Sequence, residues 1–578
     1  MTSPATAKRT SMGRYPFHRL ILVLLLSWIL ISASAQVYLA ITDTTSNTVD
    51  LLFDDAYYYL GIAWHLAHDN TSMFASPFIT NGYHPLWLLL LTGVTALLDL
   101  SKHGLFIACL VLTAAVQCIG LYIFGQGTSD PVRRTAGRIA IFIAILKFPL
   151  VFSMGMETTL FIIFIPLLMQ AATGALSSRR QCVKLGILMS LVFLTRLDAL
   201  ALDVAVMGIA LATRRLPWKH APAVLMPLVV TLVVYAAINI HFFGTPLPVS
   251  GQAKAIGNVL GSNLLTSRAF TDSSTLIIAM IAIWALARLT VARNLRAGGL
   301  EICSLAIATA ACGLYYGVFS SWPIWKWYLY PCAWLFIYAM IAGILGSAAL
   351  IAKARSFLSP WPWARIAFLS VAVIVFGMAA SAFVSRQRYQ DTFVYEYGIK
   401  RNLPRTSDIK ESSFNRENVD LLPWLEARYP GSATIVMGDR AGGLGYWMPE
   451  RFKLLHVEGL VADKPFLEVL RSGTLANWLS TQNADLYISD RPGALEIENV
   501  FGFVEPVQPR VTNGVLNILC FHRKDVLAST SYLWDEKPQI RQIFDYRQRM
   551  DCPAAILTKF EELQKTTGGV RTAYGFVR

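Results

Sequence analysis

The sequence predicts an α-helical polytopic membrane protein with about eleven spanning helices, further helices in the membrane interface, and a soluble C-terminal α/β domain. Three observations predict this fold class. The 578 residues are 55% hydrophobic and only 15% charged, whereas soluble domains carry about 25% charged residues. Apolar runs close to the ~20 residues that cross hydrocarbon recur up to residue 384. Past residue 385 the composition becomes mixed and polar.

The N-terminus is predicted to be a cytoplasmic segment, residues 1–19, followed by the first span. Four basic residues precede the apolar stretch from Leu20 to Ile41, a pattern that signal peptides share with signal anchors. The segment Ser32-Ala-Ser-Ala-Gln36 resembles a signal-peptidase site, so cleavage there is an alternative. Apolar sequence continues past that site to Ile41, which makes the segment long enough to span.

Ten further apolar runs predict the other spans of a transmembrane domain over residues 20–384. They occupy roughly 104–125, 138–154, 157–176, 183–195, 199–213, 221–243, 274–290, 299–320, 327–352 and 366–384. The segment Pro85–Leu98 is too short to cross and is predicted to be interfacial or re-entrant. This choice determines the sidedness of every later loop.

The lysines and arginines of the loops support this topology. If Pro85–Leu98 does not cross, the inner loops hold about three times as many of them as the outer segments before residue 385, as the positive-inside rule requires. The first outer loop is then 42–84, and residues 385–578 form an extracytoplasmic domain. The net charge of +14 does not indicate nucleic-acid binding, because the basic residues punctuate apolar runs.

The C-terminal domain shows ordinary strand and helix patterns. We predict strands and helices at the following positions: Ala433–Val436, Lys453–Val457, Asp485–Ile488 and Val515–Phe521 as strands, Asn418–Arg428 and Lys464–Ser480 as helices. The glycine-rich Gly438–Gly445 lacks the dinucleotide-binding spacing and is predicted to serve a turn or packing. Cys520 and Cys552 are a candidate disulfide if the compartment is oxidising.

The first outer loop carries the densest set of chemistry-capable residues. It contains no lysine or arginine and includes Phe53-Asp-Asp-Ala-Tyr-Tyr-Tyr59 and Thr80-Asn-Gly-Tyr-His-Pro-Leu-Trp87. The adjacent acids Asp54 and Asp55 open an amphipathic, aromatic-rich helix suited to the interface. Helix capping is the structural alternative for Asp54. Asp55 lies about 100° further round the helix, so the two carboxylates need not share a role.

Other ionisable residues fall at span ends on the same predicted side. Glu157 stands at the outer end of the third span, and Arg196 and Asp198 stand at a break between two short helices, where a structural ion pair is the alternative. Lys254 and Lys326, the latter near Tyr328 in an aromatic belt, break the positive-inside pattern. A phosphate ligand on the outer side would account for both lysines.

With these residues the sequence resembles the GT-C superfamily of membrane glycosyltransferases, which use polyprenyl-phosphate-linked sugars. The resemblance is carried by Asp54-Asp55, by His84-Pro85-Leu86-Trp87 and by Glu157, and it covers about residues 20–350. This set of motifs is similar to that of bacterial members near the arabinofuranosyltransferases. The chain has Asp-Asp where protein mannosyltransferases and lipid A aminoarabinose transferases often have Asp-Glu, and Glu157 where many relatives have Asp. These departures leave the particular sugar undetermined.

The resemblance implies transfer of a sugar, with inversion, from a polyprenyl-phosphate donor to an extracytoplasmic glycan, lipid or protein. Asp55 or Asp54 would act as the base, with Glu157 orienting the acceptor. Asp55 and Glu157 would alternatively bind Mg²⁺ or Mn²⁺, although some relatives are metal-free. The remaining substrate-binding candidates are Tyr58, His84, Arg196, Asp198, Lys254, Lys326 and Tyr328.

Two other classes of function stay open. A transporter or lipid flippase has similar hydropathy, but such proteins often place broken helices and ionisable groups near the midplane of repeated halves, and the sequence shows no such repeat. A sensor or assembly protein would work through its C-terminal domain. The short loops and the lack of a dense disulfide framework favour a bacterial-type inner membrane.

Overall fold

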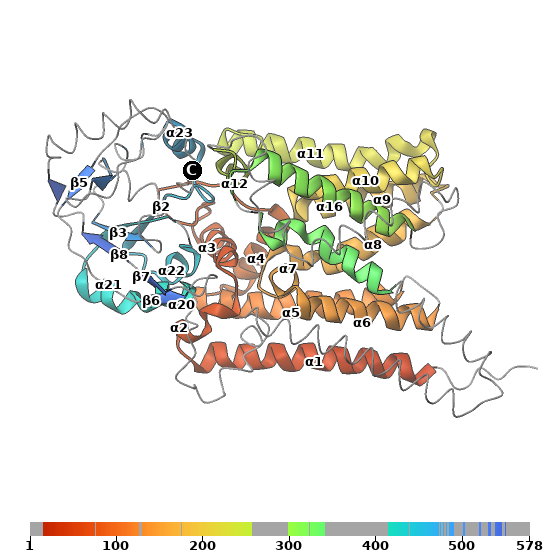
Figure 1. Ribbon diagram of the computed structural model, residues 1–578, viewed down its shortest axis with the longest axis horizontal. Coiled ribbons are helices and arrows are strands. Elements are labelled where there is room, and N and C mark those ends of the chain that lie inside the picture. Colours follow the sequence, from red (N-terminus) through yellow and green to blue (C-terminus); the bar gives the residue numbers. More distant parts are fainter. Residues whose placement is uncertain are drawn as a thin grey trace, which may run out of the picture.

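The computed structural model describes residues 15–75, 77–126, 130–174, 176–256, 299–322, 324–341, 414–438 and 440–472, with short stretches between 474 and 550. Long helices run side by side in a bundle, and the residues from 414 onward, here called the C-terminal region, lie at one end of it (Figure 1). The predicted spans 274–290 and 366–384 lie outside the described residues, as does the side chain of Cys520 and the whole of Cys552.

Four described helices are long and apolar enough to cross a bilayer, which confirms the prediction of a polytopic helical membrane protein. The candidate spans are Arg19–Thr42, Lys102–Phe124, Trp218–Phe243 and Gly299–Phe319. They correspond to α1 (Tyr15–Thr42), α5 (Lys102–Gln126), α11 (Ala221–Phe243) and α16 (Gly299–Phe319). Both α1 and α11 leave most of their apolar side chains exposed, which a helix tolerates when the surrounding solvent is lipid.

Shorter helices fill the bundle between these spans. They are α6 (Pro131–Lys147), α8 (Phe161–Thr173), α9 (Arg179–Thr195) and α10 (Leu200–Ala212). The predicted run 138–154 is in fact broken, because Pro149 ends α6 and starts the short α7 (Pro149–Phe152). A 3₁₀ turn, η2 (Glu157–Leu160), precedes α8, and another, η3 (Leu197–Ala199), precedes α10.

The interfacial segment has the predicted bounds, since α4 covers Pro85–Leu98. Its 14 residues give a length of about 21 Å at about 1.5 Å per residue, well below the ~30 Å of the hydrocarbon core. It packs chiefly on α3 (Asp54–His68) of the first predicted outer loop.

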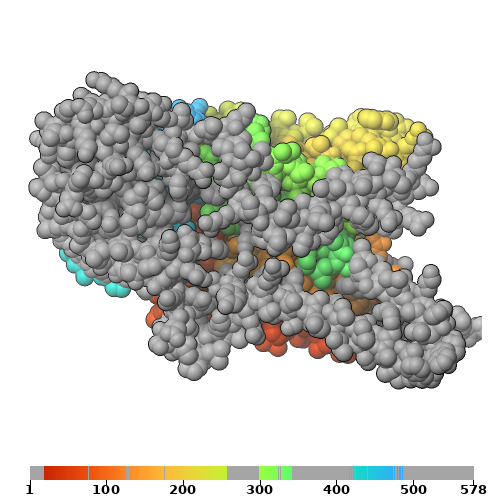
Figure 2. Space-filling view, in the orientation of Figure 1, coloured from red at the N-terminus to blue at the C-terminus, as the bar shows by residue number. Residues whose placement is uncertain are grey.

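The two ends of the bundle separate the loops as the topology predicts. Arg215 donates to the carbonyl of Thr173 at 3.0 Å, and Arg133 lies 3.5 Å from Glu301, so arginines of predicted inner loops meet residues at the inner ends of predicted spans. That end lies away from the C-terminal region, whereas α3 and α12 (Val249–Ala253) lie beside it (Figure 1). Figure 2 shows cyan residues of the C-terminal region at one end of the molecule and red residues of α1 along its lower side.

The C-terminal region contains an α/β sheet with strand order β2-β1-β3-β8. Strand β1 (Ala433–Met437) pairs in parallel with β2 (Phe452–His456) and β3 (Leu486–Ser489), and β8 (Gln542–Asp545) is antiparallel to β3. The other described strands are β4 (Phe501–Gly502), β5 (Leu519–Phe521), β6 (Thr530–Tyr532), β7 (Pro538–Ile540) and β9 (Arg549–Met550).

The helices of this region differ in detail from the prediction. The predicted helix 418–428 is two helices, α20 (Phe414–Asp420) and α21 (Leu422–Arg428), with Pro423 in the first turn of the second. Helix α23 covers Lys464–Ser472, so the predicted helix to Ser480 is too long. The glycine-rich segment after β1 forms α22 (Gly442–Trp447), a packing element as predicted.

Glycines allow the C-terminal region to approach the bundle closely. A Cβ on Gly442 would lie 2.2 Å from the backbone oxygen of Asp54, and one on Gly82 would lie 1.9 Å from the carbonyl oxygen of Leu460. The Tyr446 hydroxyl also donates to the Lys102 carbonyl at the start of α5. Helix α22 therefore packs directly on α3 and α5. Its contact with α3 is at Asp54, the first of the two predicted catalytic acids.

Candidate active site beneath the C-terminal region

Asp54 is the first residue of α3, and its carboxylate faces the C-terminal region. It does not cap its own helix, because Phe53 is the N-cap residue and makes no side-chain cap. The buried Oδ1 of Asp54 instead accepts a hydrogen bond from the Gly443 backbone N–H at 3.0 Å, and the Tyr58 hydroxyl donates to Oδ2 at 3.4 Å. The capping alternative for Asp54 is thus wrong, and its carboxylate joins two distant parts of the chain.

Asp55 lies in a different setting from its neighbour. It stays half-buried where Asp54 is buried, and its charge acts on both Lys254 and Tyr328. The Lys254 ammonium lies 4.6 Å from the centroid of the Tyr328 ring. Burial lowers the pKa of Lys254 to about 8, an effect that Asp55 partly opposes. Three predicted site residues therefore interact: the Asp55 carboxylate, the Lys254 ammonium and the Tyr328 ring.

Glu157, Arg196 and Asp198 form one buried ion network. Arg196 donates to Glu157 Oε1 at 2.6 Å and makes a two-point contact with Asp198, at 3.0 Å to Oδ1 and 2.8 Å to Oδ2. The Tyr316 hydroxyl, from α16, donates to the same Asp198 carboxylate at 2.6 Å. Burial alone would raise the pKa of Asp198, but Arg196 outweighs it and lowers the pKa to about 2. The predicted Arg196–Asp198 ion pair is present and extends to Glu157.

The turn that carries Glu157 has a defined cause. Gly155 has φ of +76°, a conformation that favours glycine, and its carbonyl accepts a hydrogen bond from the Trp87 indole at 2.9 Å. Glu157 then begins η2 and is almost fully buried. Its second oxygen, Oε2, has no hydrogen-bond partner among the described residues. A buried acceptor without a partner is costly, so this oxygen is suited to a ligand hydroxyl.

His84 bridges the first outer loop and the ion network. Its Nδ1 accepts from the Leu197 backbone N–H at 3.2 Å, and its Nε2 lies 3.9 Å from Glu157 Oε1. Burial, reinforced by the charge of Arg196, lowers the pKa of His84 to about 4. The imidazole is therefore neutral at physiological pH, with its proton on Nε2, because Nδ1 is an acceptor.

An aromatic stack forms one wall of the site. Tyr328 stacks on Tyr316 with ring centroids 4.4 Å apart, and the Arg196 guanidinium lies 5.7 Å from the Tyr328 centroid. Lys326 begins the 3₁₀ turn η5 (Lys326–Leu329), but its side chain lies outside the described residues. Tyr316 was not predicted as a site residue, because the sequence shows it only as one aromatic residue within an apolar span.

The C-terminal region adds two residues that the sequence analysis missed. His456 Nε2 lies 3.3 Å from the Tyr58 hydroxyl and 3.2 Å from Glu458 Oε2. A signal was present, since the predicted strand Lys453–Val457 contains His456 and Glu458 follows it directly, at the end of a strand where α/β sheets often bind ligands. The predicted site residue Tyr58 thus lies between Asp54 of the bundle and His456 of the C-terminal region.

The predicted metal pair does not fit a resident divalent cation in this arrangement. Glu157 Oε1 is held by the Arg196 guanidinium, whose permanent positive charge would repel a cation at that carboxylate. Among the described residues, no group of three or more His, Cys, Asp or Glu side chains is placed to hold a metal ion. We therefore derive no step through Mg²⁺ or Mn²⁺.

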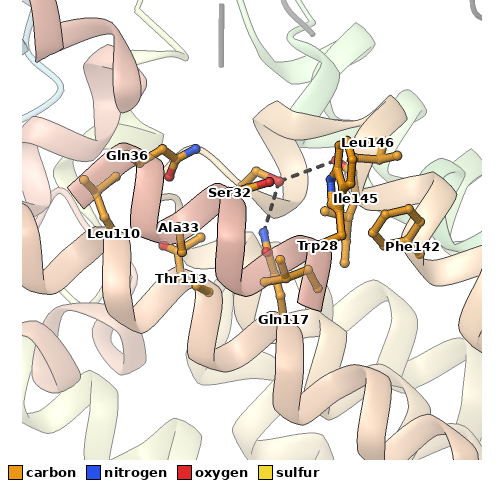
Figure 3. Close-up of a pocket in the computed structure, with 13 residues that line it drawn as sticks. Trp28, Ser32, Ala33, Gln36, Leu110, Thr113, Gln117, Phe142, Ile145 and Leu146 are labelled. Atoms are coloured by element: carbon orange, nitrogen blue, oxygen red, sulfur yellow. Dashed lines mark hydrogen bonds between the residues drawn. The ribbon is translucent and has the colours of Figure 1, made fainter. Parts of the chain in front are cut away.

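A small pocket lies within the spans, and one of its lining residues, Gln117, anchors the backbone before the Glu157 turn. Trp28, Ser32 and Gln36 of α1 face α5 and α6 across it (Figure 3). Gln117 of α5 donates to the Phe152 carbonyl at 2.8 Å and to the Ser153 hydroxyl at 3.1 Å. These bonds anchor the backbone that leads to Glu157, and the pocket contains none of the predicted site residues.

No protein-family model matches the chain, and no curated protein matches it. Among solved structures, the chain is similar to the crystal structure of ArnT from Cupriavidus metallidurans bound to undecaprenyl phosphate, with 11% sequence identity and a TM-score of 0.47. The match covers 90% of this chain and 97% of that chain.

Proposed function

We propose that the chain is a membrane glycosyltransferase that moves a sugar from a polyprenyl-phosphate donor to an extracytoplasmic acceptor. The observation that carries this proposal is the packing of the Lys254 ammonium 4.6 Å from the centroid of the Tyr328 ring, within the electrostatic reach of Asp55, at one end of an apolar helical bundle. A half-buried carboxylate beside a desolvated ammonium suits a reaction that removes a proton from a hydroxyl and releases a phosphate.

Asp55 is the base in this proposal. Its carboxylate takes the proton of the acceptor hydroxyl while that oxygen bonds to the anomeric carbon of the donor sugar. The bond from the anomeric carbon to the phosphate oxygen breaks, and the phosphate leaves with the electron pair. A single displacement of this kind inverts the anomeric centre. Asp54 is a positioning residue, because its carboxylate is already engaged by Gly443 and Tyr58.

Lys254 is the cation that receives the phosphate. Arg196 is less suited, because its guanidinium is already shared between Glu157 and Asp198. Arg196 instead holds Glu157 in place, so that the Oε2 atom, which has no partner among the described residues, accepts a hydrogen bond from a substrate hydroxyl. Stacking of sugar or lipid groups on Tyr328 fits the aromatic wall.

Transport or flipping is the second candidate, and one residue favours it. Asp203 of α10 is fully buried in the bundle, and neither of its carboxylate oxygens has a hydrogen-bond partner among the described residues. A buried acid in a membrane helix commonly marks an ion or substrate path. Glycosyl transfer is favoured because the acids and bases predicted for the site gather at the end of the bundle that meets the C-terminal region.

The experiment is a transfer assay on the full-length protein in lipid nanodiscs. Undecaprenyl-phosphate-linked arabinose, mannose, glucose and galactose serve as donors, and a panel of octyl glycosides serves as acceptors. Wild-type protein is expected to release undecaprenyl phosphate and to lengthen one glycoside. A transporter would move the donor without splitting it.

Asp55→Asn is expected to lower kcat by about 10²–10⁴-fold, the usual contribution of a general base. The matched control is Glu426→Gln, an exposed acid of α21 paired with Arg451, which is expected to keep wild-type rates. Full activity in the Asp55→Asn protein would remove Asp55 from the mechanism.

A further inference from the structure

The loop that follows β2 reaches into the rim of the candidate site. In this loop, 457–462, Gly459 has φ of +93° and packs against Ala253, the residue before Lys254. The Leu460 carbonyl meets Gly82, two residues before His84, so closely that a Cβ there would lie 1.9 Å away. The loop therefore touches both the segment that carries Lys254 and the segment that carries His84.

Glu458 is the charged residue of this loop, and its side chain turns inward. Only 8% of that side chain is exposed, and Oε2 lies 3.2 Å from His456 Nε2. His456 is fully buried and contacts the Tyr58 hydroxyl. The charge of Glu458 acts on Tyr328, as does that of Asp55. A carboxylate accepts strong hydrogen bonds from hydroxyl groups, so a site wall that carries Glu458 favours a ligand rich in hydroxyl groups.

We propose that Glu458 binds the hydroxyl groups of the acceptor, so that the C-terminal region supplies the acceptor-selecting wall of the active site. This inference rests on the glycosyltransferase function proposed above. The donor phosphate is not a suitable partner for Glu458, because two anions repel one another. Sugar hydroxyls are suitable donors to a carboxylate, and such charge-assisted bonds are among the strong ones.

The position of Glu458 also distinguishes acceptor from donor. A polyprenyl donor must enter from the lipid around the bundle, whereas Glu458 belongs to a polar region stacked on the bundle end (Figure 1). A group held between the loop and Tyr328 would lie where the charges of both Glu458 and Asp55 act, so that Asp55 takes its proton. Glu458 would then be a specificity residue on the acceptor side and Lys254 a phosphate residue on the donor side.

The test compares Glu458→Gln with wild type in the nanodisc assay, using the octyl glycoside that wild-type protein elongates best. Glutamine keeps the shape and can still bond to His456 Nε2, but it loses the charge. The acceptor KM is expected to rise about tenfold, with the donor KM and the melting temperature unchanged. The control Glu426→Gln is expected to change none of these.

Each other outcome would overturn the inference in a recognisable way. An unchanged acceptor KM, in protein that still transfers sugar, would leave Glu458 a structural partner of His456 and leave the proposed function intact. An equal rise in both KM values with a lower melting temperature would assign it to domain packing. If the wild-type protein transfers no sugar from any donor to any acceptor, the proposed function itself fails, and this inference with it.

Discussion

Lys254 illustrates how burial changes the pKa of a charged side chain. Its ammonium packs against the faces of Tyr328 and Trp322, at 4.6 Å and 5.9 Å from the ring centroids. Removing the cation from water lowers its pKa to about 8, while the carboxylate of Asp55 holds part of the charge in place. The side chain thus remains cationic at neutral pH and loses its charge just above it.

Because the lowered pKa is about 8, the cationic form of Lys254 is present at pH 7 and lost as the pH rises through 8. The donor KM is therefore expected to rise by about tenfold between pH 7 and pH 9. Lys254→Arg is expected to flatten this rise, because guanidinium stays charged throughout that range. The measurement is kcat/KM for the donor from pH 6 to pH 10. An identical profile for both proteins would show that another group titrates.

At the scale of elements, the contact between α22 and α3 joins the two regions of the chain. It combines a glycine helix face, the Asp54–Gly443 hydrogen bond and the ring packing of Tyr446 against Tyr57, with centroids 5.6 Å apart. The backbone donor of Gly443 can reach the buried carboxylate here because Gly442 carries no side chain to collide with Asp54.

Gly442→Ala is expected to disrupt this contact, since its Cβ would lie 2.2 Å from the Asp54 backbone oxygen. We expect a melting temperature lower by several degrees, a transfer rate at least tenfold lower, and faster proteolysis of the C-terminal region. Gly431→Ala is the matched control, because a Cβ at that position would meet nothing within 4 Å. Equal behaviour of the two variants would show that α22 does not hold the site together.

Local signals explain which elements could be predicted. Helix α4 begins at Pro85 and ends at Leu98, as its proline start and apolar run indicate. Hydropathy alone missed the break at Pro149, because apolar residues continue through it, whereas the boundary just before Glu157, where the 3₁₀ turn begins, was predicted. These breaks let Glu157 and Arg196 turn toward each other instead of continuing a span.

In the site, too, residue types could be read from the sequence, whereas contacts between distant residues could not. The sequence identified Asp54, Asp55, Glu157 and Arg196 by their residue types in an apolar context, and the ion network confirms that Glu157 and Arg196 meet. It could not distinguish Asp54 from Asp55, because the difference depends on Gly443. His456 was missed for the same reason, because its partner Tyr58 is 398 residues away, and Glu458 was missed with it, because Glu458 contacts His456.

For the whole molecule, the orientation in the membrane remains a prediction. The structure brings the basic loops together at one end and the site together at the other. The excess of lysine and arginine assigns the first end to the cytoplasm. The site and the C-terminal region would then face the outside of the inner membrane.

Cysteine labelling in intact cells tests this orientation. Ile79→Cys and Trp218→Cys occupy exposed positions, 52% and 76% exposed, near the site end and the basic-loop end respectively. In a background with Cys520→Ser and Cys552→Ser, a membrane-impermeant maleimide is expected to label Ile79→Cys directly and Trp218→Cys only after permeabilisation. The reverse pattern would place the site in the cytosol and contradict the proposed substrate.

The bond between Asp54 and Gly443 also has a consequence for biosynthesis. Its two residues are 389 positions apart, so at about 5–20 residues per second tens of seconds separate their emergence from the ribosome. During that interval the membrane helices are inserted while the first acid of α3 still lacks its amide partner. We expect a nascent or prematurely terminated chain to be inert toward lipid-linked sugar, so that synthesis of the last third of the protein switches the enzyme on.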